Sequence, residues 1–290
     1  MMDSLSNEKL KEDIKNLWDN EHIKRLEEQA KIIRKHVVNM IYQAGSGHVG
    51  GSLSCVEILA VLYFHFMRHD PLNSKWEDRD RFILSKGHSA PTLYATLAEA
   101  GYLPVEELKT LRKFGSRLQG HPDINFNLPG IEVSTGSLGQ GLSIGCGIAL
   151  NARLEKKDFK TYVLLGDGEC NEGQIWEAVM FASHYKLDNL IAIIDRNNFQ
   201  IDGPTEKIIK LEPFAEKWKS FGWNVIEIDG HDIKQIIKAF DDSKKIKDKS
   251  TVIIANTIKG KCVSFMEKNN EFHGKSPTRE EYELAIIELE

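Results

Sequence analysis

Residues Thr161 to Glu169 read TYVLLGDGE, in which an apolar run ends directly in Gly166, Asp167 and Gly168. A continuously apolar run that ends in a glycine turn is typical of a strand buried on both faces of a parallel sheet. Together with this run, the strands that we expect lie at residues 81–85, 161–165, 189–195, 224–228 and 251–257. Helix-period patterns occur at residues 6–44, 55–68, 91–100, 104–114, 140–157, 174–187, 213–221, 232–245 and 278–289. Because the second half alternates strands with helices, the sequence predicts an α/β fold, with a doubly wound, mostly parallel sheet and helices on both faces.

The length and composition are those of one folded domain. The chain has 290 residues, of which 41% are hydrophobic and 28% are charged, with eight prolines and no internal repeat. This balance excludes a disordered chain and a small disulfide scaffold. No low-complexity linker marks a domain boundary. We therefore expect a single domain over residues 1–290, with an N-terminal helical extension at about residues 6–44.

Charge and cysteine content exclude several classes of partner. The net charge is −5, from 38 basic and 43 acidic side chains, and no basic run is long enough to follow a nucleic-acid backbone. The longest apolar stretch, residues 58–64, has seven residues, whereas a membrane span needs roughly 20. The N-terminus has no signal-peptide pattern, and the four cysteines form no CxxC. We expect a cytoplasmic protein with reduced thiols that binds neither nucleic acid nor membrane.

The loops after two neighbouring strands carry oxygen ligands. Asp167 follows the strand at 161–165, and Asn197 follows the strand at 189–195, one βαβ unit further along. Ends of neighbouring parallel strands meet at one edge, so these side chains can share a hard divalent cation with backbone carbonyls and phosphate oxygens. The glycines beside Asp167 let backbone N–H groups approach a bound anion. Such residues also favour ordinary turns, so the pair at this spacing is far more specific than either loop alone.

The pairing of GDG at 166–168 with NN at 197–198 resembles the diphosphate–metal motif of thiamine-diphosphate enzymes. Further motifs follow the order seen in transketolases: SGHVGG at 46–51, SKGH at 85–88, GHPD at 120–123, TGSLGQG at 135–141, EG at 172–173 and HG at 273–274. The resemblance spans residues 46–274 and implies the thiamine-diphosphate-binding fold of the diphosphate domain. Because the chain stops where that domain would end, it resembles more narrowly the N-terminal subunit of a split transketolase.

The resemblance implies thiamine diphosphate as the cofactor, with Mg²⁺ or Ca²⁺. The metal ion would be held by Asp167, the Asn197 side chain and the Phe199 carbonyl. An all-oxygen site suits both ions, so the sequence does not choose between them. The residues implied to bind the cofactor are His88, Gly136, Ser137, Leu138, Gly166, Asp167, Gly168, Glu169, Asn197, Ile201 and His273.

Histidines beside glycine or proline recur in these motifs. The resemblance implies that His48, His121 and His273 are catalytic, lining the substrate channel and moving protons on sugar hydroxyls, while His88 and His273 contact the diphosphate. Ketol transfer needs an electron sink that thiamine supplies and no side chain does. The accompanying proton transfers near neutral pH suit histidine. Val49 stands where many relatives have Pro, which leaves the geometry of the His48 loop open.

The activity that the resemblance implies is transketolase. The enzyme would transfer a two-carbon ketol unit from a ketose phosphate to an aldose phosphate, in pentose phosphate metabolism. In this family an activating Glu and a pyrimidine pocket come from the following domain, but only sixteen residues follow Gly274, and a further domain needs on the order of 100. We therefore expect activity only with a separate C-terminal subunit, assembled as a heterotetramer. Glu172, Glu177 and the helix containing Gly145 would lie at subunit interfaces.

Other functions remain open on the residues alone. A 1-deoxyxylulose-phosphate synthase-like half would use the same cofactor, but the loops at 120–122 and 135–141 favour transketolase. A non-catalytic, regulatory thiamine-diphosphate subunit is disfavoured by the intact histidines. A dinucleotide oxidoreductase would explain GSGHVG at 45–50, which matches GxGxxG. That motif follows a helical pattern rather than a strand, so its required βαβ context is missing.

Two further patterns have mainly structural interpretations. His65 and His69, at i and i+4, suit two zinc ligands on one helix face, but there is no third ligand and no HExxH. A solvated helix end is expected there. Gly145, Gly147 and Ala149 would let another helix approach closely, which suggests tight packing or a subunit contact.

Overall fold

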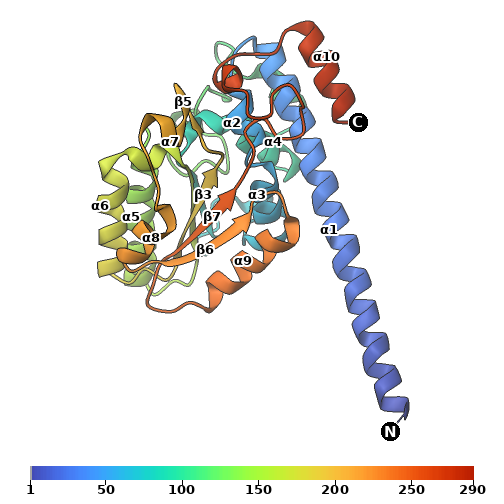
Figure 1. The fold of residues 1–290 in the computed structure, drawn as a ribbon, viewed down its shortest axis with the longest axis vertical. Coiled ribbons are helices and arrows are strands. Elements are labelled where there is room, and N and C mark those ends of the chain that lie inside the picture. Colours follow the sequence, from blue (N-terminus) through green and yellow to red (C-terminus); the bar gives the residue numbers. More distant parts are fainter. Residues whose placement is uncertain (1) are drawn as a thin grey trace.

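The computed structural model describes residues 2–290, with side chains described from residue 20 onward. A five-stranded parallel sheet, ordered β1–β2–β3–β7–β6, forms its centre (Figure 1). The strands are β1 (Arg81–Leu84), β2 (Thr161–Gly166), β3 (Leu190–Arg196), β6 (Asn224–Asp229) and β7 (Thr251–Asn256). The predicted α/β, doubly wound parallel sheet is thus confirmed, and each of its five strands lies where the sequence pattern placed it.

Helices surround this sheet. The α-helices are α1 (Met2–Ala44), α2 (Val49–Leu53), α3 (Val56–Val61), α4 (Ala90–Glu99), α5 (Gln140–Leu154), α6 (Gly173–His184), α7 (Thr205–Ile208), α8 (Phe214–Ser220), α9 (Ile233–Lys245) and α10 (Arg279–Glu288). The shorter elements are the helices η1 (Leu62–Phe66), η2 (Pro71–Asn73), η3 (Gly87–Ser89), η4 (Val105–Thr110), η5 (Ile124–Phe126), η6 (Gly168–Asn171) and η7 (Asn270–His273), and the hairpin β4 (Phe199–Gln200) and β5 (Gly203–Pro204). No helix among the described residues combines the length and apolar content needed to cross a bilayer.

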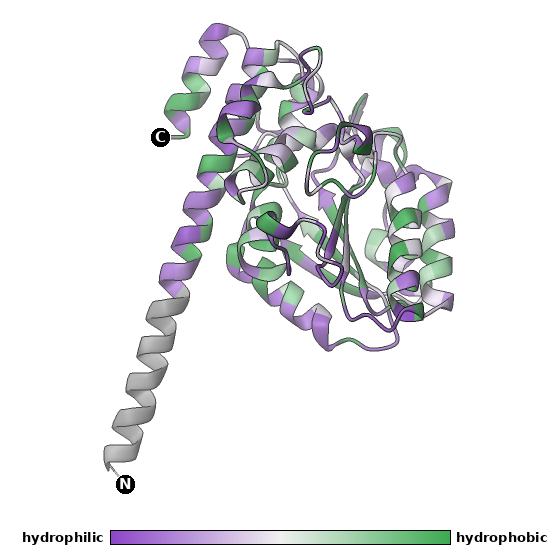
Figure 2. Cartoon of the chain, turned by 180° about the vertical axis from the view of Figure 1, so that it is seen from behind, coloured by the Kyte–Doolittle hydropathy of each residue, from purple (hydrophilic) through white to green (hydrophobic). Residues whose placement is uncertain are grey.

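Alternate side chains of each strand enter opposite cores. On β2, Tyr162 and Leu164 join the core shared with α1, α3, α4 and α9. Val163 and Leu165 join the second core, shared with α5, α6 and α8. Because both faces are covered, the inner strands β2, β3 and β7 are largely apolar rather than alternating with polar residues, whereas the edge strand β6 also carries Glu227 and Asp229. Figure 2 shows this distribution, with largely hydrophobic strands and hydrophilic residues on the outer helix faces.

The helix predicted over residues 55–68 is present, but it changes its type along its length and a short helix that was not predicted precedes it. The chain forms α2, then α3, and then η1, which is a π-helix. Between α2 and α3 the hydroxyl of Ser54 donates to Asp195 Oδ2 on β3, at 2.6 Å. This contact joins the turn between the two helices to the sheet, and the sequence pattern did not indicate α2.

The helix predicted over residues 104–114 is also shorter than expected. Only the 3₁₀ helix η4 forms there. Arg112 follows with a φ of 58°, a left-handed conformation that a continuing helix does not allow.

The glycines of α5 face two different environments. A Cβ on Gly145 would lie 2.6 Å from Val163 Cγ2 on β2, whereas a Cβ on Gly147 would meet nothing within 4 Å. The close approach expected at Gly145 is therefore to the sheet and not to another helix. A subunit contact on the outer face of α5, at Gly147, stays a prediction.

Gly145→Ala is expected to lower the free energy of unfolding by about 1–3 kcal/mol, because the added methyl overfills the α5–β2 contact. Gly147→Ala is the matched control, and its better helix propensity should raise the stability by up to about 1 kcal/mol. Urea unfolding of the two variants gives both values. Equal effects of the two substitutions would contradict this packing.

Candidate active site at the carboxyl edge of the sheet

The site lies where β2 and β3 end side by side. Gly166, the last residue of β2, pairs in register with Asp195 of β3. A cavity of about 470 Å³ opens at this edge. Its lining includes nearly all of the residues predicted to bind cofactor, metal or substrate, namely His48, His88, His121, Gly136, Leu138, Gly166, Asp167, Gly168, Glu169, Asn197, Phe199, Ile201 and His273. Ser137 of the predicted set is exposed and does not line the cavity.

Asp167 ties the two loops of this edge together. Its carboxylate is 1% exposed and accepts from the backbone N–H groups of Gly168 (2.9 Å) and Asn198 (2.6 Å). Asn197 Oδ1 accepts from the Phe199 N–H at 3.0 Å. Burial, followed by the charge of Asp195, raises the pKa of Asp167 to about 7. A buried carboxylate that is held by backbone N–H groups alone is suited to bind a positive ion brought from outside.

The donor set at this place consists of oxygen atoms. It offers one carboxylate, from Asp167, one amide oxygen, from Asn197, and the backbone carbonyl of Phe199. No group of three or more His, Cys, Asp or Glu side chains able to hold a metal ion occurs in the described part of the chain. Oxygen ligands of this kind suit Mg²⁺ or Ca²⁺ rather than a transition metal.

A buried ion pair forms the floor of the cavity. Lys86, 1% exposed, is ion-paired with Asp195, which is fully buried. Lys86 Nζ also donates to the carbonyl of Gly51 at 2.8 Å, and Asp195 accepts from the hydroxyls of Ser54 and Thr257. Burial alone would raise the pKa of Asp195, but the Lys86 ammonium and these hydroxyls bring it below its ordinary value. In the sequence, Lys86 belongs to a motif and Asp195 to the end of a predicted strand, and neither was assigned a role.

Four histidines from separate segments meet above this floor. The ring centroid of His48 lies 5.4 Å from that of His88, 6.2 Å from that of His121 and 5.5 Å from that of His273. Burial, and then the charge of Arg112, lowers the pKa of His48 to about 4. The pKa values of the other three are lowered too, chiefly by burial. Near neutral pH these imidazoles are therefore uncharged and each can give or take a proton.

Lys259 is a site residue that sequence reasoning missed. Its ammonium contacts His273 Nδ1 at 2.9 Å and Asn270 Oδ1 at 2.8 Å. Burial, followed by the charge of Lys86, lowers the pKa of Lys259 to about 8. It stands in a loop between β7 and η7, outside every motif considered, so no sequence pattern indicated it.

The site contains small and unpaired features that suit a ligand. Gly136 has a φ of 135°, and a Cβ there would lie 2.9 Å from the His121 ring. A Cβ on Gly168 would lie 2.9 Å from Gln200, so neighbouring side chains of the cavity wall pack directly against both glycines. Among the described residues, His48 Nδ1 and Gln200 Nε2 are buried with no hydrogen-bond partner. Polar atoms of this kind are costly unless a ligand or water satisfies them.

Three predicted residues occupy unlike positions around the cavity. Glu169 is 2% exposed, and its carboxylate accepts from the backbone of Gly139 and Gly166 at 3.0 Å and from the Ser85 hydroxyl. Leu138 is half-buried, whereas Ile201 is 68% exposed at the mouth. Glu169 therefore joins three loops by hydrogen bonds from inside the protein, whereas Leu138 and Ile201 lie beside the opening of the cavity.

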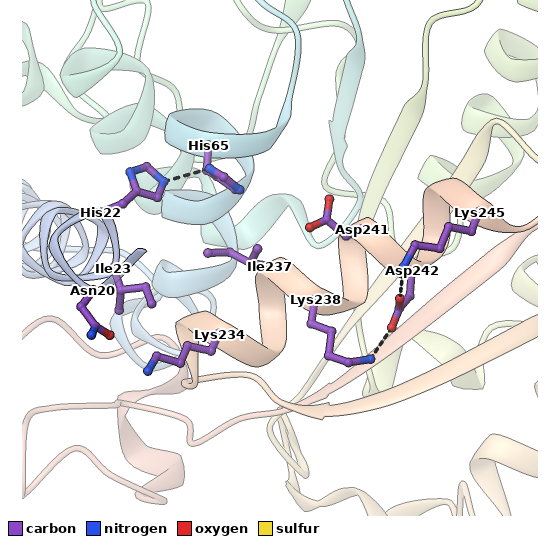
Figure 3. Close-up of a pocket in the computed structure, with 10 residues that line it drawn as sticks. All are labelled: Asn20, His22, Ile23, His65, Lys234, Ile237, Lys238, Asp241, Asp242 and Lys245. Atoms are coloured by element: carbon purple, nitrogen blue, oxygen red, sulfur yellow. Dashed lines mark hydrogen bonds and ion pairs between the residues drawn. The ribbon is translucent and has the colours of Figure 1, made fainter. Parts of the chain in front are cut away.

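The remaining sequence candidates lie away from this edge. His65 Nδ1 is 2.8 Å from His22 Nε2, across a groove of about 800 Å³ between α1 and α9 (Figure 3). His69 points elsewhere, with its nitrogens at 2.7 Å from the Tyr63 carbonyl and 3.0 Å from the Tyr102 hydroxyl. The two histidines thus share no metal site. His65 is exposed, as expected for a solvated helix end. His69 is half-buried, so the expectation of solvent exposure is wrong for this residue.

The GxGxxG match also lacks the surroundings that a dinucleotide needs. Residues 45–48 connect α1 to α2 and residues 49–50 begin α2, so a helix rather than a strand precedes the match. The βαβ context of a dinucleotide fingerprint is therefore absent at this motif.

Comparison with known proteins identifies relatives of two lengths. The family described as the transketolase, thiamine diphosphate binding domain matches residues 26–287. An apulose-4-phosphate transketolase subunit of Phocaeicola vulgatus is 48% identical over 267 residues, which cover 92% of this chain and 94% of that protein. The 6-deoxy-6-sulfo-D-fructose transketolase subunit SqwG of a Clostridium species is 48% identical over 265 residues, covering 91% and 96%.

Full-length transketolases match over part of their length. Human transketolase is 41% identical over 272 residues, covering 93% of this chain and 43% of that protein. The solved transketolase of Leishmania mexicana superposes with a TM-score of 0.86 at 33% identity, covering 91% and 41%. The chain therefore spans about two fifths of these longer enzymes and almost all of the two relatives that are named as transketolase subunits.

The lowered pKa of His48 predicts an acid-sensitive contribution to stability. Its pKa is about 4 in the folded chain and about 6.5 in the unfolded chain, so between these values only the unfolded chain takes up the proton. The folded state is then destabilised as pH falls through 6.5. His48→Gln should remove this penalty, and the stability of the variant relative to the wild type should rise as pH is lowered from 7.5 to 5. Urea unfolding at several pH values measures it; a difference independent of pH would contradict the assignment.

Proposed function

The chain belongs to the family of the transketolase thiamine diphosphate binding domain, and from that premise we propose that it transfers ketol units as one half of a two-subunit enzyme. Its near full-length match to two proteins named as transketolase subunits supports a thiamine-diphosphate-dependent, transketolase-type half. The reaction proposed is transfer of a two-carbon unit from a ketose phosphate to an aldose phosphate, within pentose phosphate metabolism. The synthase-like and purely regulatory alternatives are not favoured, because the relatives are named transketolases.

One observation carries the mechanism. Four neutral histidines line one cavity together with Lys86 and Asp167, and the buried ammonium of Lys259 contacts one of these histidines. An uncharged imidazole can accept a proton from a sugar hydroxyl and return it to an alkoxide. The unpartnered Nδ1 of His48 is available for this exchange, and His121 and His273 present further imidazoles to the same space. These three are the histidines we propose as catalytic.

The residues present fit thiamine diphosphate with a divalent cation. Asp167, the Asn197 side chain and the Phe199 carbonyl would hold Mg²⁺ or Ca²⁺, while the Gly168 N–H, His88 and His273 would contact the diphosphate. When bound, the cofactor supplies the electron sink for cleaving the bond next to a ketose carbonyl. The chain's own residues bind and orient it. Lys86 and Lys259 add positive charge beside the polyanion.

A second subunit would complete the site. Exposed apolar side chains lie at the cavity mouth and beyond it, with Ile201 at 68%, Ile208 at 43% and Ile209 at 59% exposure. Further ones, Leu154 (73%) and Met180 (50%), lie on α5 and α6. Exposed apolar surface of this kind is typical of contacts with other chains. We propose that the partner supplies an activating Glu and the pyrimidine pocket, and that two copies of each chain form a heterotetramer that includes Glu172 and Glu177 at its interfaces.

We further propose that the enzyme acts in the cytoplasm. The four cysteines are free: Cys55, Cys146 and Cys170 are buried and Cys262 is exposed. Free thiols are typical of a reducing compartment. The substrates are proposed only as a class, sugar phosphates, because the names of the two similar subunits refer to two different sugars.

Asp167→Ala is expected to abolish cation-dependent binding of thiamine diphosphate while leaving the chain folded. The reason is that the cation held by Asp167 neutralises the negative charge of the diphosphate, which the carboxylate would otherwise repel. Calorimetry with Mg²⁺, with and without EDTA, measures it. Asp202→Ala removes an exposed carboxylate from the same cavity wall and should retain binding. Undiminished binding by Asp167→Ala, or in EDTA, would exclude the proposed metal ligands.

The isolated chain is expected to show no ketol transfer with saturating thiamine diphosphate and Mg²⁺. A cofactor held at its diphosphate end alone lacks the carboxylate that activates the pyrimidine. Mixing with the partner subunit should restore turnover, measured as loss of the donor ketose. Robust turnover by the isolated chain would contradict the two-subunit proposal.

A further inference from the structure

His231 links two elements outside the active site. It lies in the loop between β6 and α9, where Nδ1 is 3.1 Å from Glu57 Oε2 and Nε2 is 2.8 Å from the backbone nitrogen of Ile258. The Ile258 nitrogen can only donate, so Nε2 is the acceptor and carries no proton. The ring proton therefore resides on Nδ1 and is donated to Glu57. Both ring nitrogens of this neutral imidazole are satisfied.

A buried ion pair fixes the carboxylate that holds His231. Glu57 on α3 is 7% exposed and is ion-paired with Arg34 of α1, which is 4% exposed. Burial alone would raise the pKa of Glu57, but Arg34 and then His231 bring it below its ordinary value. The carboxylate therefore stays ionised and remains an acceptor for His231. Through this chain of contacts α1 and α3 hold the loop that follows β7.

Three consecutive residues of that loop have three different tasks. The Thr257 hydroxyl binds Asp195, the Ile258 N–H donates to His231, and the Lys259 ammonium contacts His273. Further along, the Gly260 N–H donates to the Gly50 carbonyl at 2.9 Å. The backbone on both sides of Lys259 is therefore fixed by hydrogen bonds, from Ile258 to His231 and from Gly260 to Gly50, and these set where its side chain points.

We propose that His231 is a positioning residue of the active site, which holds Ile258 so that Lys259 reaches His273. The role of His273 in the reaction rests on the proposed function. The contact between Lys259 and His273 does not. His231 lines a separate cavity of about 370 Å³ with Asp229, Asn256, Thr257, Ile258 and Lys261. It therefore acts only through the loop.

The titration of His273 reports on this contact directly. His273 faces Lys259, His48 and Lys86, and its ring stacks on that of His88 at 5.6 Å. Burial, and then Lys259, lowers the pKa of His273 to about 4. If Lys259 moves away, a proton on His273 costs less and the pKa rises. A substitution that affects only overall stability does not move this value.

Three substitutions of His231 separate the two hydrogen bonds. His231→Phe removes both of them. His231→Asn keeps a donor for Glu57 but is too short to accept from Ile258. His231→Gln carries one donor and one acceptor at the depth of Nε2. The matched control is His36→Phe, because His36 makes a similar contact, 2.9 Å to Glu99, on a part of α1 that does not line the active-site cavity.

The experiment is a pH titration of the full chain labelled with ¹³C-histidine, with the His273 signal assigned from a His273→Gln spectrum. We expect the pKa of His273 to rise by at least about half a unit toward its ordinary range in the Phe and Asn variants. It should change little in the Gln variant and in the His36 control. In the complex with the partner subunit, the Phe and Asn variants should lose roughly 10-fold or more in kcat with little change in KM.

An unchanged His273 titration in the folded Asn variant would overturn the proposal, even where the Phe variant fails to fold. An equal rise in the Gln variant or in the His36 control would overturn it too. The proposed function has its own test in the same preparation: wild-type chain with partner that shows no ketol transfer would overturn that function, while the titration would still decide whether His231 positions Lys259.

Discussion

The ion pair between Lys86 and Asp195 is the interaction on which the candidate site depends. Lys86 follows β1 and Asp195 belongs to β3, so the pair spans the end of the strand between them. The backbone of α2 and the hydroxyls of Ser54 and Thr257 bind to the same two charges. Removing one partner would leave the other buried and unpaired, at a cost of about 3–5 kcal/mol. Segments far apart in the sequence are thus brought to one edge by a single pair of charges.

The two buried carboxylates at this edge have pKa values that are shifted in opposite directions. Asp195 and Asp167 end neighbouring strands, yet the pKa of Asp195 is lowered and that of Asp167 is raised to about 7. The difference arises because Lys86 contacts Asp195 directly, whereas Asp167 is held by backbone N–H groups. One carboxylate therefore fixes the fold of the edge while the other is left for an incoming cation. The lowered pKa values leave the histidines uncharged, so the positive charge at this edge resides on Lys86 and Lys259.

The sequence was informative where local patterns and strand ends decide the outcome. The apolar run ending at Gly166 predicted both a strand and the place where a site forms, because parallel strands end at a common edge. The sequence did not reveal the contact of Lys259 with His273 or the pairing of Lys86 with Asp195, because no periodicity relates the residues that these contacts join. The short helix α2, before the predicted helix at 55–68, was not predicted either. Gly145 was recognised as a close approach, but the sequence does not say whether a sheet or a helix approaches.

The order of the strands has a consequence for how the chain reaches this structure. β1 pairs with β2, which lies about eighty residues later in the sequence. β3 pairs with β7, although β6 lies between them in the sequence. Every pairing in the five-stranded sheet is parallel and closes a long loop, and such topologies fold slowly. The floor of the cavity needs the ends of β1, β2, β3 and β7 together and cannot assemble piece by piece. Any ligand held at this edge would therefore recognise only chains whose sheet is complete, and would favour the finished fold over its partly folded precursors.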